Sequence, residues 1–559
     1  MTYFIYEKKQ YYETPPKFLE NDYSYYTPDE SRPKRIAYGL LKPKFMPSYL
    51  VDTYDMRLVK GSDVDQGYCT LSYSWNQSGE ILIDKTTGKS SRLDQGKHEI
   101  IFPESALQEN SEYQEQTLDE VKYVKFEGLI QEICRDFGIR YIWYDQMCID
   151  QEDEKKKHAE IHQMHKIYSN AYCTVALIPE LMIDNVESPG STVYEFDHYS
   201  MFQEAQWMKR MWTLEEALVS SQILFVGRNV HLWSYNLKEY TYPIFHMQSN
   251  YAIPAVLHYA QTRTSTKEHD HIFALANIFP DIIKQITVNY NQDVQDLMLQ
   301  FYGLLAKHDL RILCFGRIAY DNDMHKPSPG HSMEGDDMDK VKCEQGLVQK
   351  FDLPSWTGVH GKYYKYGYRK TIFKNYTVSG KVLKITCWGI TNDQRPTNIL
   401  DFQRIGDMIP PFTQQEEGRT TVLQVRLQGP TKENFIYVDC KINRELDPIK
   451  YKDVVANVRD LSHFFPIKKT DLQWVSYDDM IFSSTFSFNN LTEPLQDSAQ
   501  YVLLSGVNLM LNIGGIGTER LPVIKKDGDH YKAIGTCGIT EYDYFLEDPI
   551  LEEQTFEIH

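Results

Sequence analysis

Hydrophobic residues in the first half of the chain fall into short continuous runs separated by helical repeats. Short apolar runs are typical of strands that are buried on both faces. Four such runs predict strands at residues 68–73, 141–144, 174–178 and 223–227. Apolar side chains over residues 126–137 recur at spacings of three and four, which predicts an amphipathic helix that ends at Gly138. Strands that alternate with helices predict a parallel α/β sheet.

One continuous helix is expected between the second and third strands. Its buried face is formed by apolar residues at helical spacing, namely Ile161, Met164, Ile167, Tyr168 and Ala171. Asp150 precedes this helix and is expected to cap it. His158, His162 and His165 are interpreted as a solvated helix face, because the stretch "HAEIH" does not have the order of residues found in a zinc protease.

Changes in composition and periodicity divide the chain into five predicted segments. A leader rich in Tyr and Pro precedes the α/β domain, a helical extension and an acidic exposed linker follow it, and short alternating apolar stretches predict a β-rich C-terminal region. The expected bounds are 1–60 for the leader, 61–230 for the α/β domain, 231–316 for the helical extension, 317–350 for the linker and 351–559 for the β-rich region.

The composition narrows the class of protein. The chain has 559 residues and a formal net charge of −19, which argues against nucleic acid as a partner. Its nine cysteines form no C-x-x-C pair, a pattern that favours reduced thiols over disulfides or a zinc ribbon. The start of the sequence does not resemble a signal peptide, and no stretch approaches the roughly 18 apolar residues of a membrane span. We therefore predict a cytoplasmic protein.

Polar and aromatic side chains gather where the predicted strands end. Tyr73, Ser74 and Trp75 follow the first strand, and Asp145 follows the second. Arg210 opens a later helix, "RMWTLEEAL". In an open α/β sheet, ligands bind beyond the carboxyl ends of the strands. We therefore expect these residues to form a binding site at one edge of the sheet.

Four stretches carry a resemblance to a known family. They resemble, in order and spacing, the four successive motifs of the fungal heterokaryon-incompatibility (HET) domain: "YCTLSYSW" (68–75), "YIWYDQMCIDQ" (141–151), "QMHKIYSNAYCTV" (163–175) and "RMWTLEEAL" (210–218). Two later stretches, "DHIFALANI" (270–278) and "LPSW" (353–356), are similar to segments that often follow that domain. The chain departs from the family pattern at Asn76, where Gly is usual, and at Glu215, where Gln is usual.

The resemblance implies a role in fungal non-self recognition and cell death, and a TIR/flavodoxin-like fold, similar to Toll/interleukin-1 receptor (TIR) domains. Some TIR domains cleave NAD with a Glu four residues after a Trp on a helix, the spacing of Trp212 and Glu216. The resemblance thus implies Glu216 as the catalytic residue, which would stabilise an oxocarbenium-like ribosyl cation. NAD would be a substrate, with no bound cofactor or metal. Tyr73 or Trp75 would stack on a ring of NAD, and Arg210 would contact its phosphates.

Other interpretations remain open. The domain can be a non-catalytic assembly module that acts through self-association or a protein partner. It can also be an inactive scaffold, which the departures at Asn76 and Glu215 allow. Asp145 also fits a capping role, in which it holds its loop by bonding backbone amides. Whether Glu216 must be a carboxylate separates the enzyme from the assembly module.

Overall fold

The computed structural model of the chain forms two structural units. The first contains residues 1–249 and 263–292, and the second contains residues 250–262 and 293–559. The structure describes residues 3–8, 40–83, 90–102, 120–183, 201–202, 204–237, 244, 253–316, 351–364, 373–391, 421–425, 472–476, 485–487, 491–493, 496, 499–504, 506–507, 509–513, 516–540 and 553–559.

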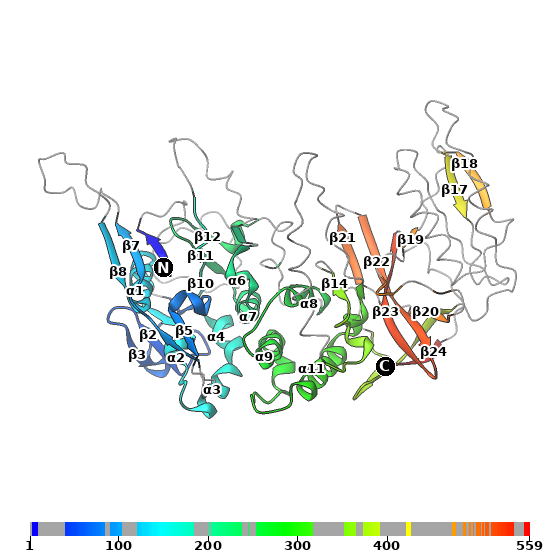
Figure 1. The fold of residues 1–559 in the computed structure, drawn as a ribbon, viewed down its shortest axis with the longest axis horizontal. Helices are drawn as coiled ribbons and strands as arrows, with labels where there is room; N and C mark the ends of the chain where they lie inside the picture. Colours follow the sequence, from blue (N-terminus) through cyan, green and yellow to red (C-terminus); the bar gives the residue numbers. More distant parts are fainter. Residues whose placement is uncertain are drawn as a thin grey trace, which may run out of the picture. The chain divides into compact units, whose positions relative to one another are not determined.

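A seven-stranded sheet forms the centre of the first unit (Figure 1). Its strands are β2 (Tyr49–Asp52), β3 (Arg57–Lys60), β4 (Cys69–Ser72), β9 (Tyr141–Trp143), β10 (Thr174–Leu177), β11 (Ile223–Val226) and β12 (His231–Trp233). They lie in the order β12-β11-β10-β4-β9-β2-β3. The four central strands, β11, β10, β4 and β9, are parallel, whereas the edge strands pair antiparallel.

The parallel core consists of the four strands that the apolar runs predict. The chain passes from β4 to its neighbour β9, then returns past β4 to β10 and continues outward to β11. The sheet as a whole is mixed rather than purely parallel. Two of its strands, β2 and β3, come from the end of the segment that was predicted as a leader. β2 joins the sheet because Leu50 and Val51 are fully buried, and β3, which is mostly exposed, pairs with β2 at the edge.

Helices of the first unit cover this sheet. They are α1 (Phe126–Phe137), α2 (Asp145–Cys148), α3 (Glu154–Ile161), α4 (Met164–Asn170), α6 (Gln206–Lys209), α7 (Met211–Val219), α9 (Glu268–Ile278) and α10 (Pro280–Ile283). The predicted end of α1 is confirmed, because Gly138 takes the left-handed conformation, with φ 68°, that closes a helix. Helices α4, α7 and α9 pack against one another. No described helix is long and apolar enough to cross a membrane.

The single helix predicted between β9 and β10 is instead two helices, α3 and α4. The chain leaves the helical conformation at Gln163, with φ −107° and ψ 2°. Asn277 of α9, which is fully buried, bridges the break. Its Nδ2 donates to the carbonyl oxygen of Ile161 at 3.1 Å, and its Oδ1 accepts from the backbone amide of His165 at 3.4 Å. A distant side chain thus satisfies backbone groups that a continuous helix would have paired locally.

Two further predictions about this segment were wrong. His165 is buried, with its Nδ1 3.1 Å from Oδ1 of Asn277, and Nε2 of His162 lies 2.9 Å from a carbonyl oxygen of α10. These two histidines therefore do not form a solvated face. The cap of α3 is Asp153, which accepts hydrogen bonds from two backbone amides of the first turn, whereas Asp150 accepts from amides of the preceding turn.

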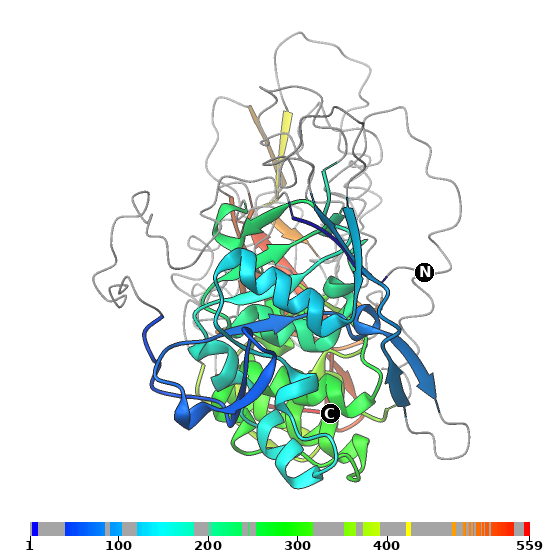
Figure 2. The ribbon, with the colours of Figure 1, turned by 90° about the vertical axis from the view of Figure 1, so that its left-hand side faces the viewer.

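Two smaller β structures are formed mainly by residues between β4 and α1, and β1 from the start of the chain joins one of them (Figure 2). Strands β1 (Ile5–Glu7), β7 (His98–Phe102) and β8 (Glu120–Val124) form one sheet, and β5 (Glu80–Ile83) pairs with β6 (Ser90–Leu93) as a hairpin. Gly79, at the base of the hairpin, has φ 152°, and a Cβ atom there would lie 2.8 Å from the carbonyl oxygen of Leu93. The absence of a side chain therefore allows the hairpin to close.

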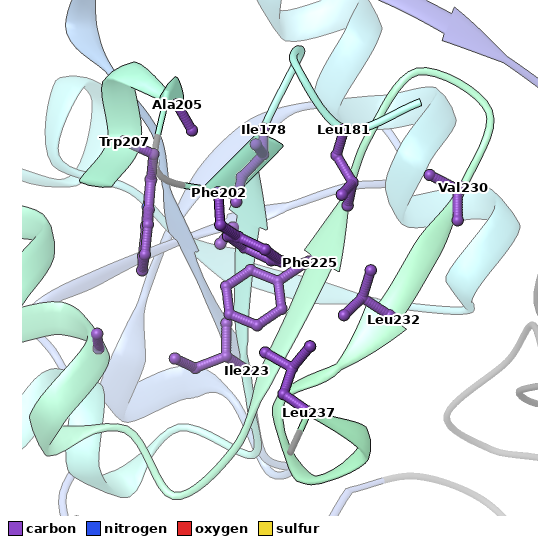
Figure 3. Packing of buried hydrophobic residues seen from close by; sticks show 12 residues of the cluster. Ile178, Leu181, Phe202, Ala205, Trp207, Ile223, Phe225, Val230, Leu232 and Leu237 are labelled. Atoms are coloured by element: carbon purple, nitrogen blue, oxygen red, sulfur yellow. The ribbon is translucent and has the colours of Figure 1, made fainter. Parts of the chain in front are cut away.

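A hydrophobic cluster packs against β10 and β11 (Figure 3). The rings of Phe202 and Trp207 both meet Phe225 edge-on, with centroid distances of 4.8 and 5.8 Å. The cluster consists of Ala176, Ile178, Leu181, Phe202, Ala205, Trp207, Ala217, Ile223, Phe225, Val230, Leu232 and Leu237. Because interiors are close-packed, this cluster fixes the orientation of the Trp207 indole.

The second unit combines helices with an eight-stranded sheet. Its longer helices are α8 (Ile253–Gln261) and α11 (Val294–His308), and β13 (Phe315–Gly316) pairs with β14 (Lys362–Tyr363). The sheet contains β15 (Tyr376–Ser379), β16 (Val382–Thr391), β19 (Thr485–Ser487), β20 (Tyr501–Leu504), β21 (Leu509–Ile513), β22 (Ile516–Asp527), β23 (His530–Thr540) and β24 (Glu553–Ile558). Strands β17 (Thr421–Val425) and β18 (Leu472–Ser476) form a separate pair.

Short 3-10 helices connect several of these elements. They are η1 (Gly61–Asp63), η2 (Trp75–Ser78) and η6 (Ser234–Asn236) in the first unit, and η8 (Leu310–Leu313) and η11 (Ser355–Thr357) in the second. Trp356 of the "LPSW" stretch lies in η11, fully buried, and its indole donates to the carbonyl oxygen of Lys381 at 3.0 Å. The predicted linker at 317–350 lies outside the described residues.

Candidate functional site

Glu216 extends from α7 to the carboxyl end of β4. The hydroxyl of Ser72, the last residue of β4, donates a hydrogen bond to Oε2 of Glu216. The indole Nε1 of Trp207 donates to Oγ of the same serine at 2.6 Å, which leaves the serine proton for the carboxylate. The Tyr168 hydroxyl of α4 donates to the carbonyl oxygen of Leu71 at 3.3 Å, and it also interacts with Glu216, whose pKa it lowers. Three elements therefore hold this side chain in one orientation.

The environment of Glu216 raises its pKa. The side chain is buried, and burial disfavours the charged form, so the pKa rises from 4.5 to about 7. The hydrogen bond from Ser72 and the positive charge of Arg210 oppose this rise, whereas the negative charge of Asp145 adds to it. At neutral pH the group exchanges readily between carboxylate and carboxylic acid, which suits a group that takes part in proton transfer.

Asp145 holds the two aromatic residues that follow β4. Its Oδ1 accepts hydrogen bonds from the Tyr73 hydroxyl at 2.7 Å and from the backbone amide of Gln146 at 2.8 Å. Its Oδ2 accepts from the Trp75 indole. Asp145 thus fixes its loop mainly through aromatic donors on another strand end, and its negative charge stays close to Glu216.

Arg210 and Trp212, at the start of α7, face different partners. The guanidinium of Arg210 lies over the Trp75 ring at 5.9 Å from the centroid. The Trp212 side chain forms a hydrogen bond with Asp270 of α9, whose carboxylate also accepts from the Tyr290 hydroxyl at 2.6 Å. Burial raises the pKa of Asp270, and the positive charge of Arg210 opposes that rise. Arg210 therefore lies within electrostatic reach of two acids on different helices.

The structure brings five of the seven predicted site residues into one cluster. Tyr73, Trp75, Asp145, Arg210 and Glu216 are linked by the contacts above, and we name them the strand-end cluster. Trp212 is next to it but bonds to α9. Ser74 is buried and its backbone amide donates to the Gln77 side chain at 3.1 Å, so it shapes η2.

The two aromatic side chains of the strand-end cluster already pack against other side chains. The Tyr73 ring packs on Phe126 at 4.9 Å between centroids, and its hydroxyl bonds to Asp145. The Trp75 ring is covered by Arg92 of β6, with 4.2 Å from Cζ to the centroid. The structure therefore does not favour the stacking of a ligand ring on either residue, and it gives both a supporting role.

Glu215, next to Glu216 on α7, is a buried acid with a different environment. Its side chain is fully buried, and neither carboxylate oxygen has a hydrogen-bond partner within the described part of the chain. Burial, and then the negative charge of Glu216, raise its pKa well above the usual 4.5. Burial therefore favours the neutral form of Glu215.

Several residues of the site were not predicted. The sequence indicates Ser72 and Tyr168 only as strand and core residues, and no pattern in it indicates Trp207 or Arg92 as part of the site. A hydroxyl inside a strand buried on both faces was the one available signal, because buried polar groups need hydrogen-bond partners. Nothing in the sequence around Arg92 indicates that its hairpin reaches Trp75, since that contact is long-range.

Cys148 lies in α2, close to Asp145 in the sequence. Cys148 is buried, and burial raises the pKa of its thiol, as expected for a packed residue rather than a nucleophile. Among the residues that the structure describes, no group of three or more His, Cys, Asp or Glu side chains is arranged to hold a metal ion.

Comparisons with known proteins match a segment that contains Tyr73, Trp75 and Asp145, whereas Arg210 and Glu216 lie beyond it. The family model "Heterokaryon incompatibility protein (HET)" matches residues 68–188. The chain is similar to Vegetative incompatibility protein HET-E-1 of Podospora anserina, at 24% identity over 106 residues. This alignment covers 19% of the chain and 7% of that protein, so the chain spans a small part of its relative. No solved structure matches significantly. The predicted resemblance is thus confirmed for this segment.

Proposed function

We propose that this chain, whose residues 68–188 match the HET family model, is an effector of fungal non-self recognition and programmed cell death that cleaves NAD to nicotinamide and an ADP-ribose product. The observation that carries the proposal is the position of Glu216. A buried carboxylate with a pKa of about 7 is held by Ser72 and Tyr168 at the carboxyl end of a parallel strand. Perturbed acids at such positions are candidates for catalysis.

The topology of the sheet supports a TIR/flavodoxin-like fold. Counted in chain order, the parallel strands lie as 2-1-3-4, where the first is β4. In sheets of this order, the chain reverses direction beside the first strand, and ligands bind near that point. Ser72 and Tyr73 lie at the carboxyl end of β4, and Glu216 reaches the same end from α7.

The chemistry requires one well-placed carboxylate. The bond between ribose C1′ and the nicotinamide nitrogen breaks, and its electron pair leaves with nicotinamide as a neutral molecule. Positive charge develops on the ribosyl group, and the negative charge of Glu216 stabilises it. Water then adds to C1′, and Glu216 accepts the proton that the water loses, a transfer for which a pKa of about 7 is suited.

The two departures from the family pattern are compatible with activity. Asn76 lies in η2, and among the described residues only Met56 and several glycines have positive φ. A glycine is therefore not required at position 76. Burial favours the neutral form of Glu215, and a carboxylic acid has nearly the shape and polarity of the Gln amide that is usual in the family.

Nicotinamide release from NAD by the full chain, at a concentration that allows self-association, tests the proposal. We expect Glu216→Gln to abolish release, because the amide cannot carry the negative charge. Glu215→Gln is the matched control, since it makes the same change at the next residue of the same buried helix and should retain release. Loss of release in both variants, or in neither, would contradict the assignment of Glu216.

The pH dependence gives an independent check of the same residue. Because Glu216 acts as the carboxylate, we expect kcat/KM to rise with pH through about 7 and then level off. One group titrates over about two pH units. A value of kcat/KM that stays constant between pH 5.5 and 8.5 would therefore contradict this role.

A non-catalytic assembly module is the second candidate function. The observation that favours it is the burial of Glu216, which is 8% exposed and bonded by neighbouring side chains, as a structural acid would be. In that case no protein would release nicotinamide, while the full chain would self-associate or bind a protein partner. Light scattering of the wild type and Glu216→Gln would then report whether the carboxylate controls assembly.

A further inference from the structure

Two arginines from distant parts of the first unit lie over one indole ring. Cζ of Arg92 is 4.2 Å from the centroid of Trp75, and Cζ of Arg210 is 5.9 Å from it. Arg92 belongs to the β5–β6 hairpin, and Arg210 precedes α7. Within the described residues, neither arginine forms an ion pair with a carboxylate, and the Trp75 ring attracts both through the negative face of its π system.

The acids that interact with these two arginines are engaged by other groups. Asp145 and Glu216 interact electrostatically with them, and Asp270 of α9 interacts with Arg210. Both oxygens of Asp145 already accept hydrogen bonds from Tyr73 and Trp75. Glu216 is partly neutral at pH 7, because burial raises its pKa to about 7. The carboxylate of Asp270 accepts a hydrogen bond from Tyr290, and within the described residues none of these acids forms an ion pair with Arg92 or Arg210.

The charges of the two arginines also repel each other. Burial and the charge of Arg210 both lower the pKa of Arg92, although Arg92 stays protonated. A chain with net charge −19 has many acids that could have compensated these groups. An anion placed between them would relieve the repulsion and would replace the missing counter-charge.

The hairpin holds Arg92 while leaving most of its donors available. Nη1 of Arg92 donates to Oγ of Ser78 at 2.6 Å, and this is its one hydrogen bond to a described residue. Ser78 is itself fixed, because its hydroxyl donates to the Trp75 carbonyl oxygen at 2.9 Å and accepts from Gln146 at 2.8 Å. A guanidinium has five N–H donors in a planar fork, which matches phosphate oxygens.

We propose that Arg92 and Arg210, supported by Trp75, bind the pyrophosphate of a dinucleotide, and that the β5–β6 hairpin makes the site selective for dinucleotides over nucleosides. This inference rests on the proposed function, since it assigns the phosphates of the NAD whose ribosyl bond Glu216 would act on. It also assigns Trp75 as the support of two cations instead of a stacking surface for a base.

Ligand binding to the full chain tests the inference separately from catalysis. The Glu216→Gln background prevents turnover, and calorimetry would measure NAD and ADP-ribose, which contain a pyrophosphate, beside nicotinamide riboside and adenosine, which do not. We expect Arg92→Gln to weaken ADP-ribose binding by about tenfold or more. Arg92→Lys, which keeps the charge but not the fork, should give an intermediate loss. Arg57→Gln, on the edge strand β3, is the control and should change nothing.

The outcomes separate this inference from the proposed function. If Arg92→Gln, folded by circular dichroism, binds ADP-ribose within about twofold of its parent, the inference is overturned even if Glu216-dependent cleavage stands. Absence of ADP-ribose and NAD binding to the parent would also overturn it. If binding depends on Arg92 but the wild type releases no nicotinamide, the inference holds and the proposed cleavage fails. If Arg92→Gln does not fold, the ratio of ADP-ribose to adenosine affinity in Arg92→Lys decides, and an unchanged ratio would overturn the inference.

Discussion

The two units of the chain place an arginine near a buried carboxylate in opposite ways. In the second unit, Nε of Arg311 lies 2.8 and 3.1 Å from the two carboxylate oxygens of Asp309, and both side chains are less than 10% exposed. In the first unit, Arg210 and Glu216 influence each other's charge without forming an ion pair within the described residues. A buried charge in a structural core needs a partner of opposite charge. A charged side chain at a site without such a partner can instead bind a ligand of opposite charge.

Breaking the ion pair between Arg311 and Asp309 should give the largest change in unfolding free energy. Arg311→Met leaves the Asp309 carboxylate buried without its partner, which should cost about 3–5 kcal/mol of unfolding free energy. Denaturant titration followed by circular dichroism would measure it. Lys284→Met, which breaks an exposed pair with Asp281, is the control and should cost less than about 1 kcal/mol. Equal losses would mean that the burial of the pair is not what matters.

Removing the charge of Glu216 should raise the unfolding free energy, which is the opposite of the effect expected at Arg311. The pKa of Glu216 in the folded protein, about 7, lies above its ordinary 4.5, so the folded state binds more protons between these pH values. The stability of the wild type should therefore fall as pH rises from about 4.5 to 7. Glu216→Gln removes this fall, and at pH 8 it should be more stable than the wild type by up to about 3 kcal/mol.

Unfolding titrations at pH 5 and pH 8 measure this effect. We expect the wild type and Glu216→Gln to converge at pH 5 and to separate at pH 8. Glu215→Gln should behave in the same direction, because burial also raises the pKa of Glu215. Parallel stability curves for all three proteins would show that these acids are not titrating as their burial implies.

The smallest change in unfolding free energy is expected at Asp145 of the first unit, whose carboxylate accepts several hydrogen bonds. Tyr73→Phe removes one of the donors to Asp145 and leaves the Trp75 indole and the Gln146 amide in place. The loss in unfolding free energy should be about 1–2 kcal/mol. Thermal unfolding would measure it. A loss as large as that of Arg311→Met would mean that Asp145 depends on Tyr73 as strongly as Asp309 depends on Arg311.

The sequence predicted those features of the fold that depend on local patterns. Four continuous apolar runs gave the parallel strands, and the repeat over residues 126–137 with Gly138 gave α1 and its end. Local patterns failed where a distant residue decides the backbone. The helix break at Gln163 depends on Asn277, and no residue near the break indicates that contact. Local helix propensity is weaker than such tertiary contacts.

The prediction of the candidate site was limited in the same way, to features that follow from local patterns and topology. The rule that polar residues at strand ends approach one another indicated Tyr73, Trp75 and Asp145, because it follows from the topology alone. The contacts that orient Glu216 come from Ser72 and Tyr168, whose positions depend on how helices pack on the sheet. Sequence patterns do not specify such packing, so these partners became visible only in the structure.

Asn277 has a consequence for the modularity of this chain. Its amide joins α3 to α4 from a helix that lies beyond the predicted boundary at residue 230. A protein cut at that boundary would lose α9 and would leave the helix break without its bridge. The smallest piece that can be exchanged, duplicated or expressed alone should therefore extend to residue 292, so that recombination within a gene would have to carry this helix together with the sheet.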